Sequence, residues 1–447
     1  MSDRLAVNEH YLNRVVAVAE TATVEATEDI LSGSGLKLVA KGARIDARFR
    51  ERLLEHKLRK PLETSVRVVD GVASRPIDKV AQALLDQHAL LAGVCGRSTA
   101  RLVLGELRSM RLSTPVESLL SLYAAQAPHK LEHAVGIGLI SAASYYDLPE
   151  GGAAGLQKLL LAGLVHDIGE LYIDPAIVQS STRLSAEQWR HIAAHPIIGS
   201  HVLAEMPGAG PKVAEAVLYH HERLDGFGYP HGLRNDSVPV SGQVLALAEM
   251  LMGLMESRCG SGEHASVAVK LIPGEFHRLL LDRVARAAQA VAAADAADED
   301  RPFNDDPARL AAQAVAQGAT LQRLHELLMA AQDRIHRGSP ALRDLMTHVT
   351  ERCLRIRSAF SSTGLDTHGI EALREHLAAV EPAVRFEVTI VLREIDWRLR
   401  EVKRETRLRL ERLPPSEAQL VLGLIGQSKE AARQAAEASH ATPLSER

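Results

Sequence analysis

Two adjacent histidines, His220 and His221, begin the stretch HHERLDGFGYP, which ends in a turn rich in glycine and proline. Neighbouring residues on a helix project about 100° apart, so these imidazoles are poorly arranged to grip one ion together. They suit two ions side by side, or one ion and another group. A second pair, His166 and Asp167, ends the apolar run LLLAGLV. An aspartate there can bridge two cations through its two oxygens while imidazoles fill the remaining positions.

Two further histidines lie where helices could converge on these pairs. His133 stands early in the stretch LEHAVGIGL, and His195 directly precedes a proline. Imidazoles with carboxylates suit first-row metals, and two metals about 3.5–4 Å apart form the usual clamp for phosphoester displacement. No cysteine lies near these motifs, which disfavours a thiolate zinc site. A lone helical histidine is more often packed or exposed than a ligand, and 20 histidines make chance pairs common.

The order of these motifs resembles that of an HD-GYP domain, a subset of the HD phosphohydrolase superfamily. The resemblance covers about residues 120–290, and its most specific part is the run HHERLDGFGYPHGL. It implies an all-helical domain with two or three divalent ions, iron or manganese being common, and hydrolysis of cyclic di-GMP by a metal-held water. Matched position by position, it implies Asp167 as the bridging carboxylate within this ligand set: His133, His166, Asp167, His195, His220 and His221.

Three positions depart from the family pattern. The family usually reads HDxGK, with the lysine meeting substrate phosphate, whereas this chain reads HDIGE and has Glu170 there. Between two unit charges ~5 Å apart, at an effective dielectric constant near 20, the attraction or repulsion is about 3 kcal/mol. A glutamate in place of the lysine therefore turns attraction for the substrate phosphate into repulsion. Glu170 either takes a catalytic role with Asp167 by binding metal, or pairs with a nearby cation. Gln243 replaces a common arginine, and Glu249 replaces the family's last aspartate ligand.

The loop after the histidine pair carries further candidates. Arg223 either supplies positive charge or forms an external salt bridge. Other loop residues contact substrate or a partner domain, or only lock a turn that the glycines allow: Asp225, Gly226, Gly228, Tyr229 and Pro230. His129 shares a helix face with His133 and is either an extra metal ligand or an ordinary surface histidine.

The elements that must position these residues fall into three expected domains. Alternating β-like runs, VAETATVEATEDI and SVRVVDGV, flank a charged helical pattern and predict a small α+β module over residues 1–105. The pattern is helical over 110–293, which is the expected HD-GYP domain. The acidic segment 294–309 predicts a linker, and a helical C-terminal region follows over 310–440. The expected fold class is therefore mainly α.

Two of the expected helices carry specific sequence signals. Ser185 and Gln188 predict a capping box that opens the helix AEQWRHIAAH. In the C-terminal region, VTIVLREIDWRLREV carries one apolar stripe: Val388, Val391, Leu392, Ile395, Leu399 and Val402. Its other face is expected to be the solvated side of a bundle helix, or else a partner or anion surface: Arg393, Arg398, Arg400, Lys403 and Arg404.

Composition narrows the class of protein. The chain of 447 residues is 46% apolar, and its 52 basic residues nearly balance 56 acidic ones, which argues against general attraction to nucleic acid or membrane surfaces. Three dispersed cysteines predict a reducing cytoplasm rather than a disulfide framework: Cys95, Cys259 and Cys353. The N-terminus lacks a signal-peptide pattern, and the longest apolar run is short for a membrane span. These features predict a soluble, cytoplasmic protein.

Two functions of different classes are compatible with these features. The first is a metal-dependent phosphodiesterase that hydrolyses cyclic di-GMP or a related cyclic nucleotide in bacterial signalling, supported by the nearly complete ligand set. The second is a catalytically degenerate HD-GYP domain that binds metal or ligand and contacts a signalling protein through the GYP loop or the C-terminal helices. Glu170, Gln243 and Glu249 motivate the second. Metal identity, product, input signal and oligomeric state are left open.

Overall fold

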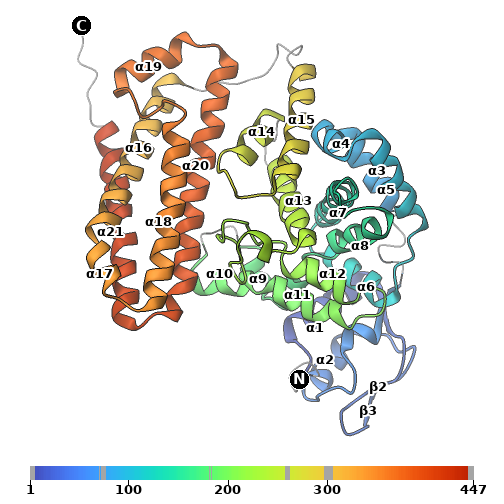
Figure 1. Ribbon diagram of the computed structural model, residues 1–447. Helices are drawn as coiled ribbons and strands as arrows, with labels where there is room; N and C mark the ends of the chain where they lie inside the picture. The colour runs from blue at the N-terminus through green and yellow to red at the C-terminus, as the bar shows by residue number, and fades with distance from the viewer. Residues whose placement is uncertain are drawn as a thin grey trace. The chain divides into compact units, whose positions relative to one another are not determined.

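The computed structural model describes residues 6–69, 71, 77–180, 182, 184–256, 262–295 and 306–440. Most of these residues are helical, and their strands are short and close to the N-terminus (Figure 1), so the expected mainly α class is confirmed. Residues 296–305 of the expected linker at 294–309 lie outside the described residues, and helices α15 (Arg278–Asp295) and α16 (Pro307–Ala330) reach into its two ends. Among the helices described, none combines the length and apolar character needed to cross a bilayer.

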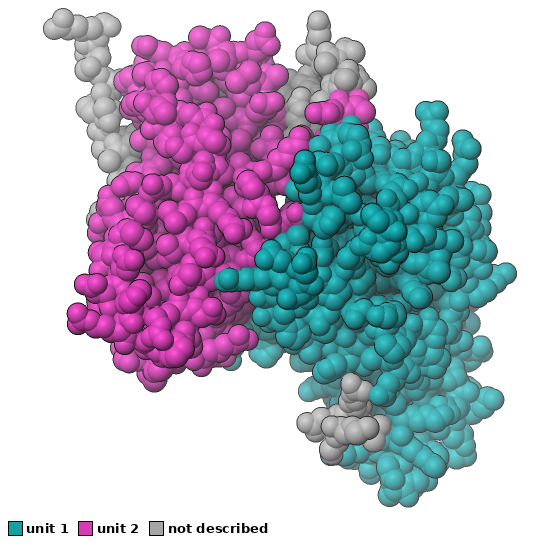
Figure 2. Space-filling view, viewed as in Figure 1, with its two compact units in different colours: residues 1–224, 228–259, 277–287 teal, residues 225–227, 260–276, 288–447 magenta. Residues whose placement is uncertain are grey.

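The chain divides into two compact units, which Figure 2 shows in different colours. Unit 1 comprises residues 1–224, 228–259 and 277–287. Unit 2 comprises residues 225–227, 260–276 and 288–447. Unit 1 thus joins the expected N-terminal module to most of the expected helical domain, and three loop residues belong to unit 2.

Unit 1 begins with a small α+β segment in which the two β-like runs pair with each other. Strands β1 (Thr23–Ala26) and β4 (Val66–Val69) are antiparallel, and Val24 and Val68 are buried partners in this pairing. Their alternation places one face of each strand inward. The other elements of this segment, in chain order, are α1 (Glu9–Thr21), β2 (Ile30–Leu31), β3 (Lys37–Val39), α2 (Ala47–Leu54) and the 3-10 turn η2 (Leu62–Thr64).

Helices make up the rest of unit 1. The capping box predicted at Ser185 and Gln188 is confirmed at the start of α10. Helices α7 and α8 pack so closely that a β-carbon on Gly163 would lie 2.5 Å from the Gly138 α-carbon. The elements are α3 (Ile77–Gln87), α4 (Ala89–Cys95), α5 (Arg97–Ser109), α6 (Thr114–Ala124), α7 (Lys130–Tyr146), α8 (Ala153–Leu164), η4 (Ile168–Tyr172), α9 (Pro175–Val178), α10 (Ala186–Ala193), α11 (His195–Ala204), α12 (Pro211–Leu218), η5 (Asn235–Ser237), α13 (Val240–Glu256) and the first part of α15 (Arg278–Asp295).

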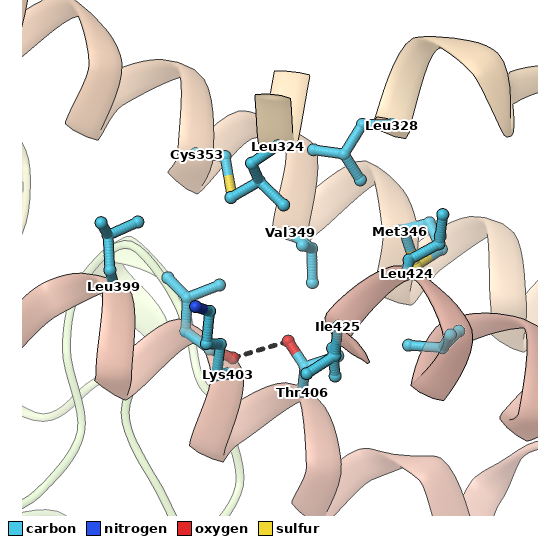
Figure 3. Close-up of a pocket in the computed structure, with 12 residues that line it drawn as sticks. Leu324, Leu328, Met346, Val349, Cys353, Leu399, Lys403, Thr406, Leu424 and Ile425 are labelled. Carbon is cyan, nitrogen blue, oxygen red and sulfur yellow. Dashed lines mark hydrogen bonds between the residues drawn. The ribbon is translucent and has the colours of Figure 1, made fainter. Parts of the chain in front are cut away.

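Unit 2 is helical around its own apolar core. The stripe predicted on α20 faces this core, where Leu392, Ile395 and Leu399 are buried. A gap of about 30 Å³ remains among apolar side chains such as Val349, and the nearby Thr406 hydroxyl donates to the Val402 carbonyl at 2.6 Å (Figure 3). The elements are α14 (Gly262–Lys270), the end of α15, α16 (Pro307–Ala330), α17 (Gln332–His336), α18 (Pro340–Ser361), α19 (Ile370–Ala379), α20 (Pro382–Arg409), η6 (Leu410–Arg412) and α21 (Pro415–His440).

The charged face of α20 differs in part from the solvated face expected. Arg393 and Arg400 are exposed, as expected, but the side chain of Arg398 is only 1% exposed. Its guanidinium donates to the carboxylates of Glu394 at 2.5 Å and Glu275 at 3.0 Å. The expectation is wrong for Arg398 because an acid distant in sequence supplies a buried partner that the pattern of one helix cannot reveal.

Candidate metal centre

Imidazoles and carboxylates from five parts of unit 1 meet around the turn that follows α8. Asp167, in this turn, is buried and belongs to two groups of potential ligand atoms lying within 4.8 Å of one another. The first group is Asp167, His195, His220 and His221, and the second is His133, His166 and Asp167. His133 comes from the first turn of α7, His195 from the start of α11, and the histidine pair from the end of α12.

The two oxygens of Asp167 divide between these groups. Oδ1 lies 3.1 Å from the His195 Nε2 and 3.5 Å from the His220 Nε2. Oδ2 lies 3.3 Å from the His166 Nε2 and accepts a hydrogen bond from the Tyr123 hydroxyl at 3.1 Å. One carboxylate therefore faces both halves of the centre.

Glu249, on α13, belongs with the second group. Its Oε2 lies 3.3 Å from the Nε2 of both His133 and His166. The additional methylene of glutamate thus still lets the carboxylate reach the two imidazoles.

Hydrogen bonds on the outer side of the rings fix how the imidazoles present their nitrogens. The Nδ1 atoms of His166, His195 and His220 each contact the carbonyl oxygen of the residue three positions earlier, at 2.8, 2.7 and 2.6 Å. A carbonyl can only accept, so each Nδ1 carries a proton and the Nε2 of a neutral ring keeps its lone pair. The Nδ1 of His133 similarly contacts Glu256 Oε1 at 2.8 Å.

The inner side of the centre fits cations. Nε2 atoms face each other at 3.0 Å between His195 and His220 and at 3.3 Å between His133 and His166, so their lone pairs need a proton or a metal ion between them. Within the described part of the chain, Glu249 Oε2 is buried and has no hydrogen-bond partner. The nitrogen and oxygen atoms that face inward lie 3.0–3.5 Å apart. Atoms at this spacing can bind the same metal ion through bonds of about 2.1 Å.

The charges at the centre depend strongly on one another. Burial would raise the pKa of the Asp167 carboxyl, but neighbouring imidazoles, His166 first, hold it well below its usual range. Burial likewise opposes protonation of His166, yet the carboxylates of Asp167 and Glu249 raise its pKa to about 9. For His221, burial and the neighbouring imidazoles lower the pKa well below its usual range. The carboxylates thus favour the protonated form of His166, whereas His221 resists protonation.

Residues 142–283 match the HD domain family. The chain contains an HD domain. The chain is 35% identical over 104 residues to 3'3'-cGAMP-specific phosphodiesterase 1 of Vibrio cholerae. This alignment covers 23% of this chain and 24% of that protein. The chain is 28% identical over 120 residues to a cyclic di-GMP phosphodiesterase of Pseudomonas aeruginosa, covering 27% of this chain and 28% of that protein.

The chain therefore matches only about a quarter of the length of these curated relatives. Among solved structures, it is similar to Bd1817, an HDG"Y"P protein from Bdellovibrio bacteriovorus, with a TM-score of 0.32 and 13% identity. That comparison covers 60% of this chain and 94% of the other.

The loop of the HD domain folds back over the histidine pair. The ring of Tyr229 stacks on His221 with centroids 4.5 Å apart, and Trp189 meets Tyr229 edge-on at 5.9 Å. A β-carbon on Gly228 would lie 2.4 Å from the Glu222 α-carbon, so this close backbone approach requires glycine. Pro230 follows Tyr229 through a cis peptide bond.

Glu222 anchors this loop, a role that the sequence analysis missed. Its buried carboxylate accepts hydrogen bonds from three successive backbone N–H groups, those of His231, Gly232 and Leu233, at 2.7, 3.1 and 2.9 Å. Arg223 is buried as well and donates to the Glu222 carbonyl at 3.2 Å. The polar sequence around Glu222 and Arg223 gives no sign that both side chains are buried.

Two loop residues contribute to unit 2 rather than to the donor groups. The Asp225 carboxylate pairs with the buried Arg352 guanidinium. The Gly226 carbonyl accepts a hydrogen bond from Arg409 at 2.8 Å. His129 is also outside both donor groups: it is exposed, at the residue preceding α7.

Glu170 pairs with a cation, which was one of the alternatives open from the sequence. Its Oε2 lies 2.7 Å from the Lys130 Nζ, and Glu170 belongs to neither donor group. Burial and the charge of Asp167 raise the pKa of the Glu170 carboxyl. Gln243 donates to the Val238 carbonyl at 2.7 Å, which is a local structural bond.

Proposed function

We propose that this protein is a metal-dependent phosphodiesterase that hydrolyses cyclic di-GMP or a related cyclic dinucleotide such as 3'3'-cGAMP. The observation that carries the proposal is the division of the two Asp167 oxygens between two groups of imidazoles. This is the arrangement expected of a carboxylate that bridges two ions. Imidazole and carboxylate donors favour first-row divalent ions, with iron or manganese the first choices.

The proposed ligands divide into two sets that share Asp167. His195, His220 and His221 hold one ion, and His133, His166 and Glu249 hold the other. Divalent ions supply Lewis-acid stabilisation of phosphoryl oxygens and lower the pKa of water. The Tyr123 hydroxyl keeps Asp167 oriented, and stacked Tyr229 limits the access of solvent to His221.

Metal analysis and a hydrolysis assay on the same preparation test this function. The full chain would be purified without oxygen, loaded with iron or manganese, and assayed on cyclic di-GMP and 3'3'-cGAMP. Asp167→Asn keeps the shape of the side chain but removes its charge, so we expect loss of both bound metal and turnover. The exposed Asp236 provides the control, because Asp236→Asn should change neither.

A second function is favoured by a specific observation, the carboxylate of Glu170 beside Asp167. An added negative charge there disfavours a phosphodiester, which supports a degenerate domain that binds metal or ligand and acts by contacting a signalling protein. Metal-loaded protein that binds a cyclic dinucleotide but never cleaves it would establish this function in place of the phosphodiesterase.

A further inference from the structure

Three carboxylates gather at the centre that is proposed to bind an anionic substrate. Asp167 and Glu249 line the donor groups, and Glu170 stands beside Asp167. Asp167 Oδ1 lies 3.1 Å from the His195 Nε2, and Glu249 Oε2 lies 3.3 Å from the His166 Nε2, so both acids face the centre. Two divalent ions would more than offset these three charges, and a phosphodiester gains further from a cation that binds its non-bridging oxygens.

Lys130, at the start of α7, brings such a cation to the position that Glu170 occupies. Its Nζ lies 2.7 Å from the Glu170 Oε2 and 4.8 Å from the centroid of the Tyr123 ring. The hydroxyl of the same Tyr123 donates to the Asp167 Oδ2 at 3.1 Å. One tyrosine thus contacts both the ammonium and the carboxylate at the middle of the centre.

The nearby Arg14 is already committed to the backbone. Its guanidinium donates to the carbonyls of Glu170 and Ile173, both at 3.2 Å, and to the Gln126 side chain at 2.5 Å. These bonds hold the turn that carries Glu170 and leave the guanidinium little freedom to meet a ligand. Lys130 differs because its side chain ends in a single ammonium that makes one ion pair and is 19% exposed.

We propose that Lys130 binds the substrate phosphate and that Glu170 is a positioning residue that holds the ammonium in place. In the HDxGK pattern the cation lies in the turn after Asp167. In this chain that turn carries the anion Glu170, and the cation Lys130 comes from α7. This inference rests on the proposed function for its substrate, although phosphate binding can be measured separately.

An ammonium suits this role because it has three N–H donors. The Glu170 carboxylate takes one, and the others can bind phosphate oxygens without breaking the ion pair. Burial opposes the charge on Lys130, but the carboxylates of Glu170 and Asp167 raise its pKa, so the ammonium persists at neutral pH.

The test measures binding of inorganic phosphate by calorimetry and the KM for cyclic di-GMP, using the manganese-loaded full chain. Lys130→Gln should weaken phosphate binding and raise KM, each at least about tenfold, because a charge-assisted hydrogen bond is lost. Metal content should stay unchanged. Lys212→Gln is the control, since Lys212 forms an exposed ion pair with Glu215 at 3.2 Å and should have no effect.

The double exchange Lys130→Glu with Glu170→Lys guards against a folding defect in Lys130→Gln. It returns the cation to the turn, so phosphate affinity should stay within about threefold of wild type, while Lys130→Glu alone should lose it. Unchanged phosphate binding in folded Lys130→Gln would overturn the inference. So would loss of binding in a folded, metal-loaded exchange variant, or a loaded wild type that binds no phosphate.

The two proposals fail in different ways. If the wild type hydrolyses cyclic di-GMP and Lys130→Gln keeps its KM and phosphate affinity, the phosphodiesterase stands and the role of Lys130 falls. If Lys130 governs phosphate binding but no cyclic dinucleotide is hydrolysed, the role of Lys130 stands and the phosphodiesterase falls.

Discussion

The outer hydrogen bond of each imidazole determines what its inner nitrogen can do. For His166, His195 and His220 that partner is a backbone carbonyl, which no side-chain substitution removes. For His133 it is the carboxylate of Glu256, at 2.8 Å. A carboxylate is the stronger partner because it both orients the ring and increases its basicity.

Glu256→Ala should therefore weaken the binding of one ion without affecting the other. We expect about a tenfold loss of affinity, the low end of the range for such outer partners, because the Glu256 side chain is 40% exposed. Competition with a chelator of known affinity measures this loss. Glu256→Gln retains an oxygen acceptor and should lose less; equal metal affinity in all three proteins would show that His133 needs no outer carboxylate.

The structure groups histidines and an aspartate that the sequence singled out, and it adds residues around them that the sequence did not reveal. Adjacent pairs such as His166 and Asp167 form local patterns, and the structure brings their side chains together. The contact of Tyr123 with Asp167 spans 44 positions, and that of His133 with Glu256 spans 123. Neither Tyr123 nor Glu256 belongs to a repeated spacing, so only the folded chain reveals the role of each.

At the scale of the elements, the close packing of α7 against α8 positions the half of the centre that contains His133 and His166. Gly163 in α8 meets Gly138 in α7, and the Gly163 carbonyl also accepts the Nδ1 proton of His166. The absence of a side chain at Gly163 therefore determines both the distance between the helices and the backbone that orients a proposed ligand.

Gly163→Ala should lower the free energy of unfolding by about 1–3 kcal/mol, because its methyl group would meet backbone atoms that cannot move aside. Chemical denaturation measures this loss, and bound metal should fall in the same variant. Gly253→Ala on α13 is the matched control: nothing lies within 4 Å of its new methyl group, so helix propensity should add about 1 kcal/mol. Equal stability of the two variants would contradict the close approach.

Two arginines on α20, two positions apart, make a second pair of variants. Arg398→Met leaves the buried acids Glu275 and Glu394 without this partner and should cost about 3–5 kcal/mol of unfolding free energy. Arg400→Met removes only an exposed pair with Asp396 and should cost at most about 1 kcal/mol. Denaturant midpoints compare the two; similar losses would place Arg398 in solvent, as the sequence pattern alone suggested.

At the scale of the molecule, the two units differ in what the sequence could show. The long apolar stripe of α20 was predictable, and its residues do face the core of unit 2. The assignment of Asp225 to unit 2 was not, because it depends on Arg352, which lies 127 positions away. The boundaries expected at 105 and 110 separate segments that the structure groups in one unit.

The stability of unit 2 should depend on pH through Glu405, which is 2% exposed. Burial, assisted by the charge of Glu401, raises the pKa of the Glu405 carboxyl to about 7. The folded state then holds more protons than the unfolded state between about pH 4.5 and about pH 7, so stability is greatest below this window and falls as the pH rises through it. The total loss should approach about 3 kcal/mol.

Glu405→Gln should remove this loss and make unit 2 more stable than wild type above about pH 7. Urea unfolding followed through Trp397 fluorescence, in a Trp189→Phe background, reports on unit 2. Glu387→Gln, an exposed position on the same helix, is the control and should keep the wild-type profile. A Glu405→Gln profile that parallels wild type at every pH would exclude this carboxyl as the cause.

The contacts of Arg14 affect how this protein can be truncated. The guanidinium that braces the carbonyls of Glu170 and Ile173 comes from the first helix, far upstream of the segment that matches the HD family. A fragment cut to that segment would retain four of the five proposed histidine ligands, but it would lose His133, Lys130 and the Arg14 contacts behind Glu170. Weak activity in such a fragment would then reflect the truncation. Functional tests therefore require a protein that retains α1.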